Sequence, residues 1–455
     1  MPRRTARTPR SVTIPQPPPS PRASAWLVER LPFAISAGAV LILGSAAAWL
    51  IADYQRAGEV VARDTPRTLA AAVPTPIASG KTVAERVAQA KQRSEHAKGA
   101  YMTNIVATDR GRAARGLRED IVALLDRTEL NAVVIDIKEV TGGAQLSPAL
   151  GELVRALRER GVWVIARQVV FKDDSQEAAH PDWYLQKKAG GIWRDNRRGS
   201  WLDPASSDVW TYQRDIAKQA IDLGFDEIQF DYIRFPSDGK IADIIYPVYD
   251  EARPRHAVLA EFFQYLNREL RGYKPEIILS ADLFGYVALQ QGADLGIGQR
   301  LADIGANFDY ISLMVYPSHY YSGFQVAADA ERGLPALFYP YRAADPADTA
   351  VAHPYEVIHR SLLIAGDILA GHASSTAMES TRPSSAKLRP WLQDFSLGVD
   401  SARGIRYGPA EIEAQIRAAE DAGASGWLLW SPDNVYSEAA LRPDPPAGMP
   451  AAAYE

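Results

Sequence analysis

From residue 98 onward, short β-branched apolar runs alternate with amphipathic segments whose apolar positions recur every three or four residues. This alternation predicts parallel strands joined by crossover helices. Eight runs are expected to be strands: Tyr101–Ala107, Ala132–Lys138, Val162–Val170, Glu227–Phe235, Ile277–Leu283, Tyr310–Tyr316, Pro390–Phe395 and Gly426–Trp430. Helices are expected between them at Gly116–Asp126, Pro148–Arg160, Ser207–Leu223, His256–Arg271, Gly298–Asn307, Glu356–Leu369 and Pro409–Ala422.

Glycines at the ends of the expected helices support the same count. Glycine readily takes the left-handed conformation that stops a helix. Such glycines lead into the next strand at Gly161, Gly224, Gly272, and Gly423 with Gly426. Eight βα units predict an α/β fold of the (β/α)₈ TIM-barrel type, with an open doubly wound sheet as the alternative. The dinucleotide fingerprint of that alternative is missing, because Leu301 stands where its third glycine should be.

The N-terminal part of the chain has a different pattern. The 22 residues from Leu31 to Ala52 include no charged side chain, which is long enough for a transmembrane helix. Six arginines and one acidic residue, Glu29, precede this run, so we expect the N-terminus to stay in the cytoplasm and the rest of the chain to lie outside it. Small residues around Ala46–Ala48 keep cleavage and a secreted form open, and a buried core helix is the remaining alternative.

These patterns divide the chain into five segments. We expect a disordered cytoplasmic tail (1–30), a transmembrane signal anchor in the inner membrane (31–52), a linker with one possible helix from Thr82 to Ala97 (53–97), a periplasmic barrel (98–437) and a C-terminal tail (438–455).

Composition excludes several kinds of chemistry. The chain has no cysteine, so disulfides, thiolate metal sites and cysteine nucleophiles are excluded. Its 50 basic and 55 acidic side chains give a net charge of −5, which does not favour a nucleic-acid partner. The seven histidines are scattered along the chain, and no phosphate-binding Walker sequence occurs. We therefore expect neither a metal nor a cofactor.

The chemistry of a barrel gathers at the carboxyl ends of its strands. The fourth expected strand carries Asp231 there and the fifth carries Asp282. Carboxylates on adjacent strands can approach closely enough to serve as the acid and the nucleophile or base of glycosidic bond cleavage. Arg167 or Lys138 would hold one carboxylate ionised, while an apolar wall would raise the pKa of the other. Asp231 and Asp282 are therefore the candidate catalytic pair, although an ion pair or a strand-end cap would also explain any single aspartate.

Other polar side chains near the same ends are candidates for substrate binding. They are Asp136, Lys138, Arg167, Asp203, Gln229, Arg234, Tyr316, His319, Gln393, Asp394, Trp430 and Asn434. Asp136 and Lys138 are two residues apart and are expected to share a face of the second strand. Asp394 is an alternative to Asp282 as the partner of Asp231.

Aromatic residues gather in the loops that follow the strands. They are Trp183, Tyr184, Trp193 and Trp201 after strand three, Tyr246 and Tyr249 after strand four, Tyr286 after strand five, Tyr320, Tyr321 and Phe324 after strand six, and Trp430 at strand eight. Flat apolar faces of this kind can stack on sugar rings, although about half of them are expected simply to pack the loops. The expected partner is therefore a carbohydrate polymer.

At these residues the chain resembles a bacterial family of glycoside hydrolases of (β/α)₈ fold, distantly similar to α-amylase-type and α-galactosidase-type barrels. The resemblance rests on the segments 98–102, 134–138, 180–184, 201–204, 224–236, 280–285, 314–320, 390–393 and 426–430. It implies a hydrolase of sugar bonds in which Asp231 is the nucleophile or base and Asp282 is the acid. The family leads us to expect an acidic pair after Lys138, whereas here Glu139 is followed by Val140.

Other functions are alternatives to this one. Chitinase-type barrels end their fourth strand in a catalytic glutamate, and this chain has Ile233 at the corresponding position. Barrel hydrolases that use a metal need histidines at strand ends, where only His319 comes near. A non-catalytic glycan-binding or envelope-scaffold protein on a barrel fold is the alternative from another class, and a transglycosylase would use the same residues.

Overall fold

The computed structural model describes residues 80–289, 294–372 and 383–443. The expected membrane anchor at 31–52 and the linker up to residue 79 lie outside these ranges. Within the described ranges, no helix is both long enough and apolar enough to span a membrane.

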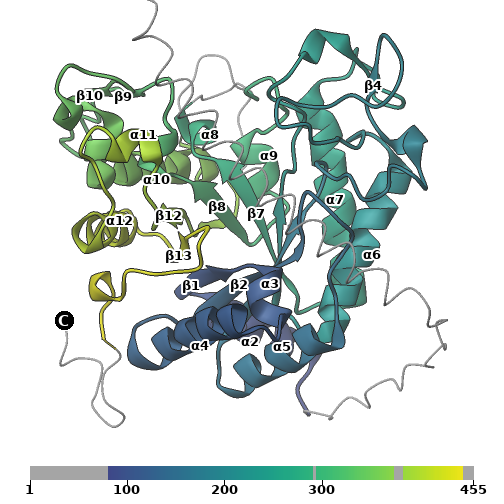
Figure 1. Ribbon diagram of the computed structural model, residues 1–455, viewed down its shortest axis with the longest axis horizontal. Helices are drawn as coiled ribbons and strands as arrows, with labels where there is room; N and C mark the ends of the chain where they lie inside the picture. The colour runs from purple at the N-terminus through teal and green to yellow at the C-terminus, as the bar shows by residue number, and fades with distance from the viewer. Residues whose placement is uncertain (1–79, 290–293, 373–382, 444–455) are drawn as a thin grey trace, which may run out of the picture. The chain divides into compact units, whose positions relative to one another are not determined.

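Eight parallel strands close into a barrel (Figure 1). They are β1 (Ala97–Met102), β2 (Ala132–Lys138), β3 (Trp163–Val169), β5 (Glu227–Asp231), β7 (Ile278–Phe284), β8 (Tyr310–Met314), β12 (Trp391–Gln393) and β13 (Gly426–Trp430). Each strand pairs with the next in this order, and β13 pairs with β1 to complete the circle. The predicted TIM barrel is therefore confirmed, and the open sheet is excluded because the barrel strands leave no free edge.

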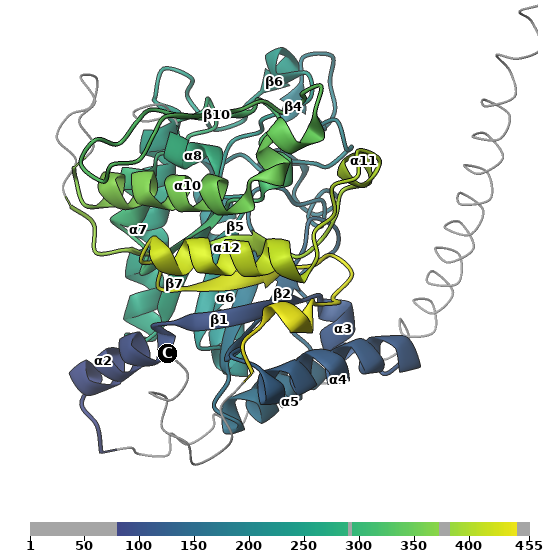
Figure 2. The same ribbon diagram turned by 90° about the vertical axis from the view of Figure 1, so that its left-hand side faces the viewer.

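Helices surround the barrel, as Figures 1 and 2 show from two sides. The longer ones are α4 (Arg112–Arg127), α5 (Pro148–Glu159), α6 (Ser207–Leu223), α7 (Arg255–Tyr273), α10 (Pro354–Leu369) and α12 (Pro409–Asp421). The short ones are α3 (Asn104–Thr108), α8 (Tyr286–Leu289), α9 (Leu301–Gly305) and α11 (Gly398–Ser401). Two small antiparallel pairs lie in the loops, β4 (Gln186–Lys187) with β6 (Ile244–Ile245) and β9 (Phe324–Val326) with β10 (Leu337–Tyr339).

Several strand boundaries differ from the prediction, and three of the differences have a visible local cause. The first strand ends at Met102 because the Thr103 side chain accepts a hydrogen bond from the Val106 N–H and starts helix α3. The fourth barrel strand ends at Asp231, where Tyr232 adopts a left-handed φ of 53°. The seventh is interrupted by Arg389 and Pro390, so that a short strand, β11 (Lys387–Leu388), precedes β12 and both pair with β8.

The glycine stops also differ at one position. Gly224 ends α6 with φ 102°, as predicted, and lets the chain turn directly into β5. Gly272, in contrast, lies inside α7, which ends at Tyr273 and is capped by Lys274. The predicted end of this helix, at Arg271, is therefore two residues too early.

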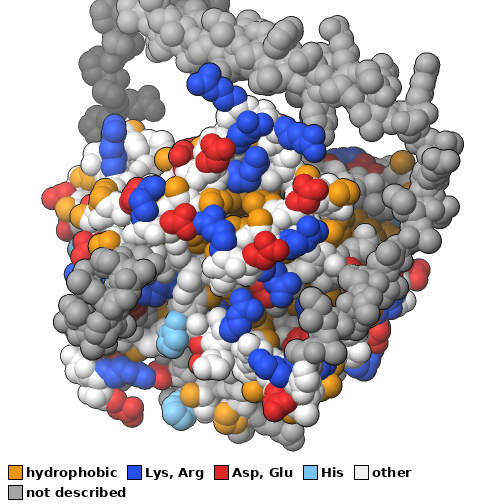
Figure 3. Space-filling view, turned by 90° about the horizontal axis from the view of Figure 1, so that it is seen from below, with side chains coloured by type: hydrophobic (Ala, Val, Ile, Leu, Met, Phe, Trp, Pro, Cys, Tyr) orange, Lys and Arg blue, Asp and Glu red, His pale blue; other side chains and the backbone are white. Residues whose placement is uncertain are grey.

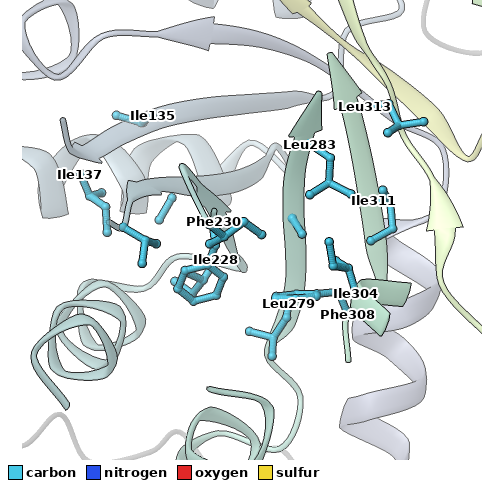
Figure 4. Packing of buried hydrophobic residues seen from close by; sticks show 14 of the residues in the cluster. Ile135, Ile137, Ile228, Phe230, Leu279, Leu283, Ile304, Phe308, Ile311 and Leu313 are labelled. Atoms are coloured by element: carbon cyan, nitrogen blue, oxygen red, sulfur yellow. The ribbon is translucent and has the colours of Figure 1, made fainter. Parts of the chain in front are cut away.

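Alternate residues of each strand face two different layers. Figure 4 shows the outer layer, in which Ile228, Phe230 and Leu279 point away from the barrel interior toward the helices. Residues at the intervening positions, such as Ile165 and Ile278, form a second apolar cluster inside the barrel. This period-two alternation carries the polar residues at the strand ends inward, toward one mouth.

Helix α2 (Val83–Ser94) packs at the amino-terminal end of the strands, in the region expected to be a linker. The Ser94 hydroxyl lies 2.7 Å from the hydroxyl of Tyr310, the first residue of β8. The Ser94 carbonyl accepts a hydrogen bond from Arg389, whose guanidinium forms a fully buried ion pair with Glu227 at 2.9 Å. Helix α2 lies in the same compact unit as the barrel.

The helical face at the bottom of Figure 1, shown from below in Figure 3, carries Lys and Arg side chains interspersed with Asp and Glu.

The first residues of the expected C-terminal tail pack on the barrel, since Glu438 pairs with Arg127 of α4 at 2.9 Å and Arg442 pairs with Glu129 at 2.7 Å. The described part of the tail therefore belongs to the barrel surface.

Candidate active site

One arginine joins three carboxylates at the carboxyl end of the barrel. Arg167 of β3 donates from Nη1 to Asp136 Oδ1 of β2 at 2.6 Å and from Nη2 to Asp231 Oδ2 of β5. Its Nε lies 3.6 Å from Asp282 Oδ2 of β7. All four side chains are buried and come from inward positions of consecutive barrel strands. The sequence prediction that Asp231 and Asp282 approach each other at one mouth agrees with this geometry.

Asp282 is the more deeply buried member of the pair, with 1% of the residue exposed. Its Oδ1 accepts a hydrogen bond from Trp391 Nε1 at 2.8 Å, and its Oδ2 accepts none from the described residues. Burial, reinforced by the charge of Asp231, raises the pKa of Asp282 well above its ordinary value, against the opposing effects of Arg167 and Trp391. The shift favours the protonated form of the Asp282 carboxyl.

Asp231 has a different environment. Besides the Arg167 contact, its Oδ1 accepts a hydrogen bond from the Tyr232 backbone N–H at 2.6 Å. Two donors therefore contact this carboxylate and fix its orientation. The left-handed backbone of Tyr232 is sparsely populated for a non-glycine residue, and strained positions of this kind concentrate at functional sites.

Asp136 holds Arg167 from the other side and is supported by Tyr101 of β1, whose hydroxyl donates to Asp136 Oδ2. Burial raises the pKa of Asp136 although Arg167 and Tyr101 oppose the shift. The Tyr101 ring stacks on Trp430 at 4.0 Å between centroids, and the Arg167 guanidinium lies 5.0 Å from the Trp430 ring centroid. Glu139 follows at the end of β2, where burial and then the charge of Asp136 raise its pKa.

A cavity of about 540 Å³ opens above these groups. Its lining includes Arg167, Asp231, Asp282, Arg234, Tyr316, His319, Trp391 and Trp430, together with Lys172, Arg197, Tyr232, Ser237, Asp238, Phe284, Gly285, Tyr286, Met314, Tyr320 and Tyr321. The volume is within the range of small-molecule sites. The cavity therefore brings both candidate catalytic residues and five of the predicted substrate-binding residues together.

Lys138 does not reach this cavity. An irregularity between Asp136 and Lys138 shifts the register of β2, so that Lys138 pairs with Gln168, whose side chain faces α6. The Lys138 ammonium forms a fully buried ion pair with Asp173 at 3.0 Å. The expectation that Asp136 and Lys138 share a face is thus wrong, because a β-bulge reverses the alternation.

Five other predicted residues hold the surrounding structure. Asp203 accepts backbone hydrogen bonds from Ala205, Val248 and Tyr249, and Asp394 accepts two from Ser437 at 2.9 Å. The Gln393 side chain donates to Ser318 and to the Phe395 carbonyl, and Asn434 accepts from the Thr103 N–H. Gln229 lies one layer below the mouth, where it donates to Ser312 at 3.1 Å. These residues shape loops or fill the barrel, and none of them lines the cavity.

The predicted aromatic residues also separate into two groups. Tyr286, Tyr320, Tyr321 and Trp430 line the cavity. Tyr184, Trp193, Trp201, Tyr249 and Phe324 are buried inside the loops. Sequence reasoning did not select Tyr101 and Trp391 as site residues, although both lie in segments that carried the family resemblance.

Replacing Trp391 with Phe is expected to shift the pH dependence of activity. The indole N–H favours the ionised form of Asp282, so its loss raises the pKa of that carboxyl further. An acid must be protonated to act, so the limb on which activity falls with rising pH should move upward by about one pH unit. A kcat/KM profile of Trp391→Phe measures this shift. Trp427→Phe is the matched control, because the buried Trp427 Nε1 has no hydrogen-bond partner among the described residues. An equal shift of the pH profile in both variants would contradict an acid role for Asp282.

Three solved structures illustrate what the chain is similar to. A hypothetical protein from Ruminiclostridium thermocellum ATCC 27405 is 34% identical over 40% of this chain and 96% of its own, with a TM-score of 0.34. The PgaB (BpsB) glycoside hydrolase domain from Bordetella bronchiseptica is 15% identical over 75% of this chain and 94% of its own, with a TM-score of 0.49. The spore cortex-lytic enzyme SleL from Bacillus megaterium QM B1551 is 12% identical over 76% of this chain and 73% of its own, with a TM-score of 0.43. No curated protein matches the chain.

A family model matches most of the chain, from residue 99 to residue 436. This range runs from inside β1 to a point just beyond β13, so it includes every strand that contributes to the cavity. The chain therefore belongs to the family described as "Putative glycosyl hydrolase domain".

Proposed function

We propose that this protein is a glycoside hydrolase that cleaves glycosidic bonds in a polysaccharide or cell-envelope glycan, with Asp282 as the acid and Asp231 as the nucleophile or base. The observation that carries the proposal is the pair of unlike carboxyls beside Arg167: the pKa of Asp282 is raised by burial, whereas two donors contact Asp231. Environments that separate two carboxyls in this way are typical of glycosidic bond cleavage.

In the proposed reaction, Asp282 gives its proton to the glycosidic oxygen, and the bond between that oxygen and the anomeric carbon breaks. The leaving sugar departs with the proton as a hydroxyl group. Asp231 either attacks the anomeric carbon or takes a proton from the water that attacks it, and water supplies the new hydroxyl in both cases. Arg167 holds the Asp231 carboxylate in place during this step.

The rest of the cavity can hold sugar rings. Tyr316, His319 and Trp430 line it with flat faces that can stack on the apolar side of a ring. Burial lowers the pKa of His319, so its imidazole is neutral near pH 7 and adds no charge to this side.

A product-detecting screen tests the proposal. The full-length protein is incubated with bacterial envelope glycans and polysaccharides, and new reducing ends are identified by mass spectrometry. We expect products from the native protein and none from the Asp231→Asn/Asp282→Asn double variant, which controls for contaminating hydrolases. Glycan binding without product would instead indicate the non-catalytic alternative. Longer products would indicate a transglycosylase.

The proposed site of action is outside the cytoplasm, with the segment 31–52 as the membrane anchor. This part of the proposal rests on the uncharged run and on the arginines that precede it. Alkaline phosphatase fused after residue 455 should be active in intact bacteria, since that enzyme folds only after export. A β-galactosidase fusion at the same position should be inactive, and the reverse pattern would refute export.

A further inference from the structure

One side of the cavity is rich in cations. Lys172 and Arg197 come from the chain that follows β3, and Arg234 comes from the chain that follows β5. The opposite side, from β7, β8, β12 and β13, is mainly aromatic. The two sides therefore favour different parts of a ligand.

Arg234 is buried without an acidic partner. Only 7% of the residue is exposed, and its guanidinium lies over Trp201 at 4.8 Å and over Phe284 at 4.6 Å from the ring centroids. Its Nη1 donates to the Phe235 carbonyl and the Ser237 hydroxyl, both at 3.1 Å. Within the described part of the chain, its Nε and Nη2 make no hydrogen bond, and no carboxylate lies within ion-pair distance. The guanidinium thus keeps free donors in the wall of the cavity.

The nearby carboxylates Asp231, Asp238 and Asp195 attract Arg234 from a distance, but none of them forms an ion pair with it. Arg167 already serves both Asp231 and Asp282, and Lys172 pairs with Asp195 at 2.7 Å. The exposed Arg197 forms no ion pair with any described residue. Asp238, the remaining carboxylate of the lining, accepts a hydrogen bond from the Asn196 N–H at 3.1 Å. Among the described residues, Arg197 and Arg234 therefore have no ion-pair partner, and Asp238 is the remaining carboxylate of the cavity lining.

A buried charge without a partner is costly, and an anionic ligand would remove that cost. A guanidinium with two free donors matches a carboxylate, which it can bind through two parallel hydrogen bonds. We infer that the cavity binds a sugar bearing a carboxylate, which Arg234 holds with the help of Arg197. This inference rests on the proposed function and names its substrate class, an acidic glycan.

The position of Arg234 adds to the argument. It follows Asp231 by three residues and lines the same cavity, and the two are joined by the strained Tyr232. The Tyr232 ring lies 5.2 Å from the Arg234 guanidinium. An acidic group held there belongs to the sugar at the cleaved bond or to its neighbour, so the charge would select the bond that is cut.

Binding measurements test the inference separately from hydrolysis. The full-length Asp282→Asn protein is titrated calorimetrically with oligogalacturonate, oligomannuronate, a hyaluronan tetrasaccharide and a muramic-acid disaccharide, each compared with its carboxyl-reduced neutral form. The first three carry a uronic acid and the last a lactyl ether, so the panel distinguishes the two sources of the carboxylate. We expect at least one acidic member to bind about tenfold more tightly than its neutral form. Adding Arg234→Gln should reduce that preference to within about twofold and weaken binding of the acidic form far more than binding of the neutral form.

Control variants separate binding from stability. Arg155→Gln, on the exposed surface of α5, should leave the preference unchanged. Arg234→Lys keeps the charge but loses the paired donors, and it should retain part of the preference. If Arg234→Gln does not fold, Arg234→Lys and Arg197→Gln decide, since both should reduce the preference.

Two results would overturn the inference: no acidic sugar preferred over its neutral form, or an equal loss of acidic and neutral binding in Arg234→Gln. Absence of product from the native protein would defeat the proposed hydrolase, but an acidic preference that depends on Arg234 would stand.

Discussion

Asp282→Asn is expected to lower kcat/KM on a glycan substrate by about 10²–10⁴-fold, because the amide cannot protonate the glycosidic oxygen. The size of the loss should depend on the leaving group. An aryl glycoside with an acidic phenol as leaving group needs little protonation, so Asp282→Asn should cleave it with nearly the kcat/KM of the native protein. Asp231→Asn should lose activity on both substrates, because the nucleophile or base is needed in either case. Steady-state kinetics with the two substrates therefore separates the two roles.

Asp394→Asn is the matched control for these variants. Asp394 is also buried at the end of a barrel strand, but its carboxylate accepts hydrogen bonds from Ser437 and lies outside the cavity lining. Its replacement should affect stability more than turnover. If Asp394→Asn were inactive while Asp282→Asn kept its activity on the glycan, Asp394 would take the place of Asp282 as the acid.

The barrel and the approach of Asp231 to Asp282 were predictable because inward and outward residues alternate along the strand sequences. Ser280 and Asp282 stand two residues apart on one strand, as Gln229 and Asp231 do on another, and the register pairs Gln229 with Ser280. Once two such strands are neighbours, their inward residues must meet at the mouth. The convergence of Asp231 and Asp282 therefore needed only the order of the strands.

The positions of Lys138, Tyr101 and Trp391 could not be predicted, because they depend on structural features that leave no local signal in the sequence. The bulge that turns Lys138 away from Asp136 does not show in a continuous apolar run. Tyr101 was placed at the start of the first strand, whereas it lies near its end and points inward at the mouth. Trp391 follows the break at Pro390, and its contact with Asp282 joins segments more than one hundred residues apart. Pairings of this kind appear only when the barrel closes.

Arg167→Met is expected to destabilise the fold and to abolish turnover together. Arg167 is the shared counter-charge of Asp136, Asp231 and Asp282, so its loss leaves buried carboxylates without a cation. Removing one partner of a buried ion pair costs about 3–5 kcal/mol in the free energy of unfolding. Urea unfolding at pH 7.5 measures that loss, and the screen for new reducing ends measures activity.

The pH dependence of this loss separates lost charge from lost packing. Arg167 lowers the pKa values of Asp136 and Asp282 against the larger effect of burial, so without it both rise further above their unfolded values. A carboxyl whose pKa is raised on folding stabilises the protein fully only below its unfolded pKa, and this stability disappears as the pH rises through the folded pKa. The deficit of Arg167→Met should therefore be largest near neutral pH and should shrink as the pH falls toward about 4. A deficit that stays constant with pH would instead indicate lost packing, and the shared counter-charge at the centre of the site would be refuted.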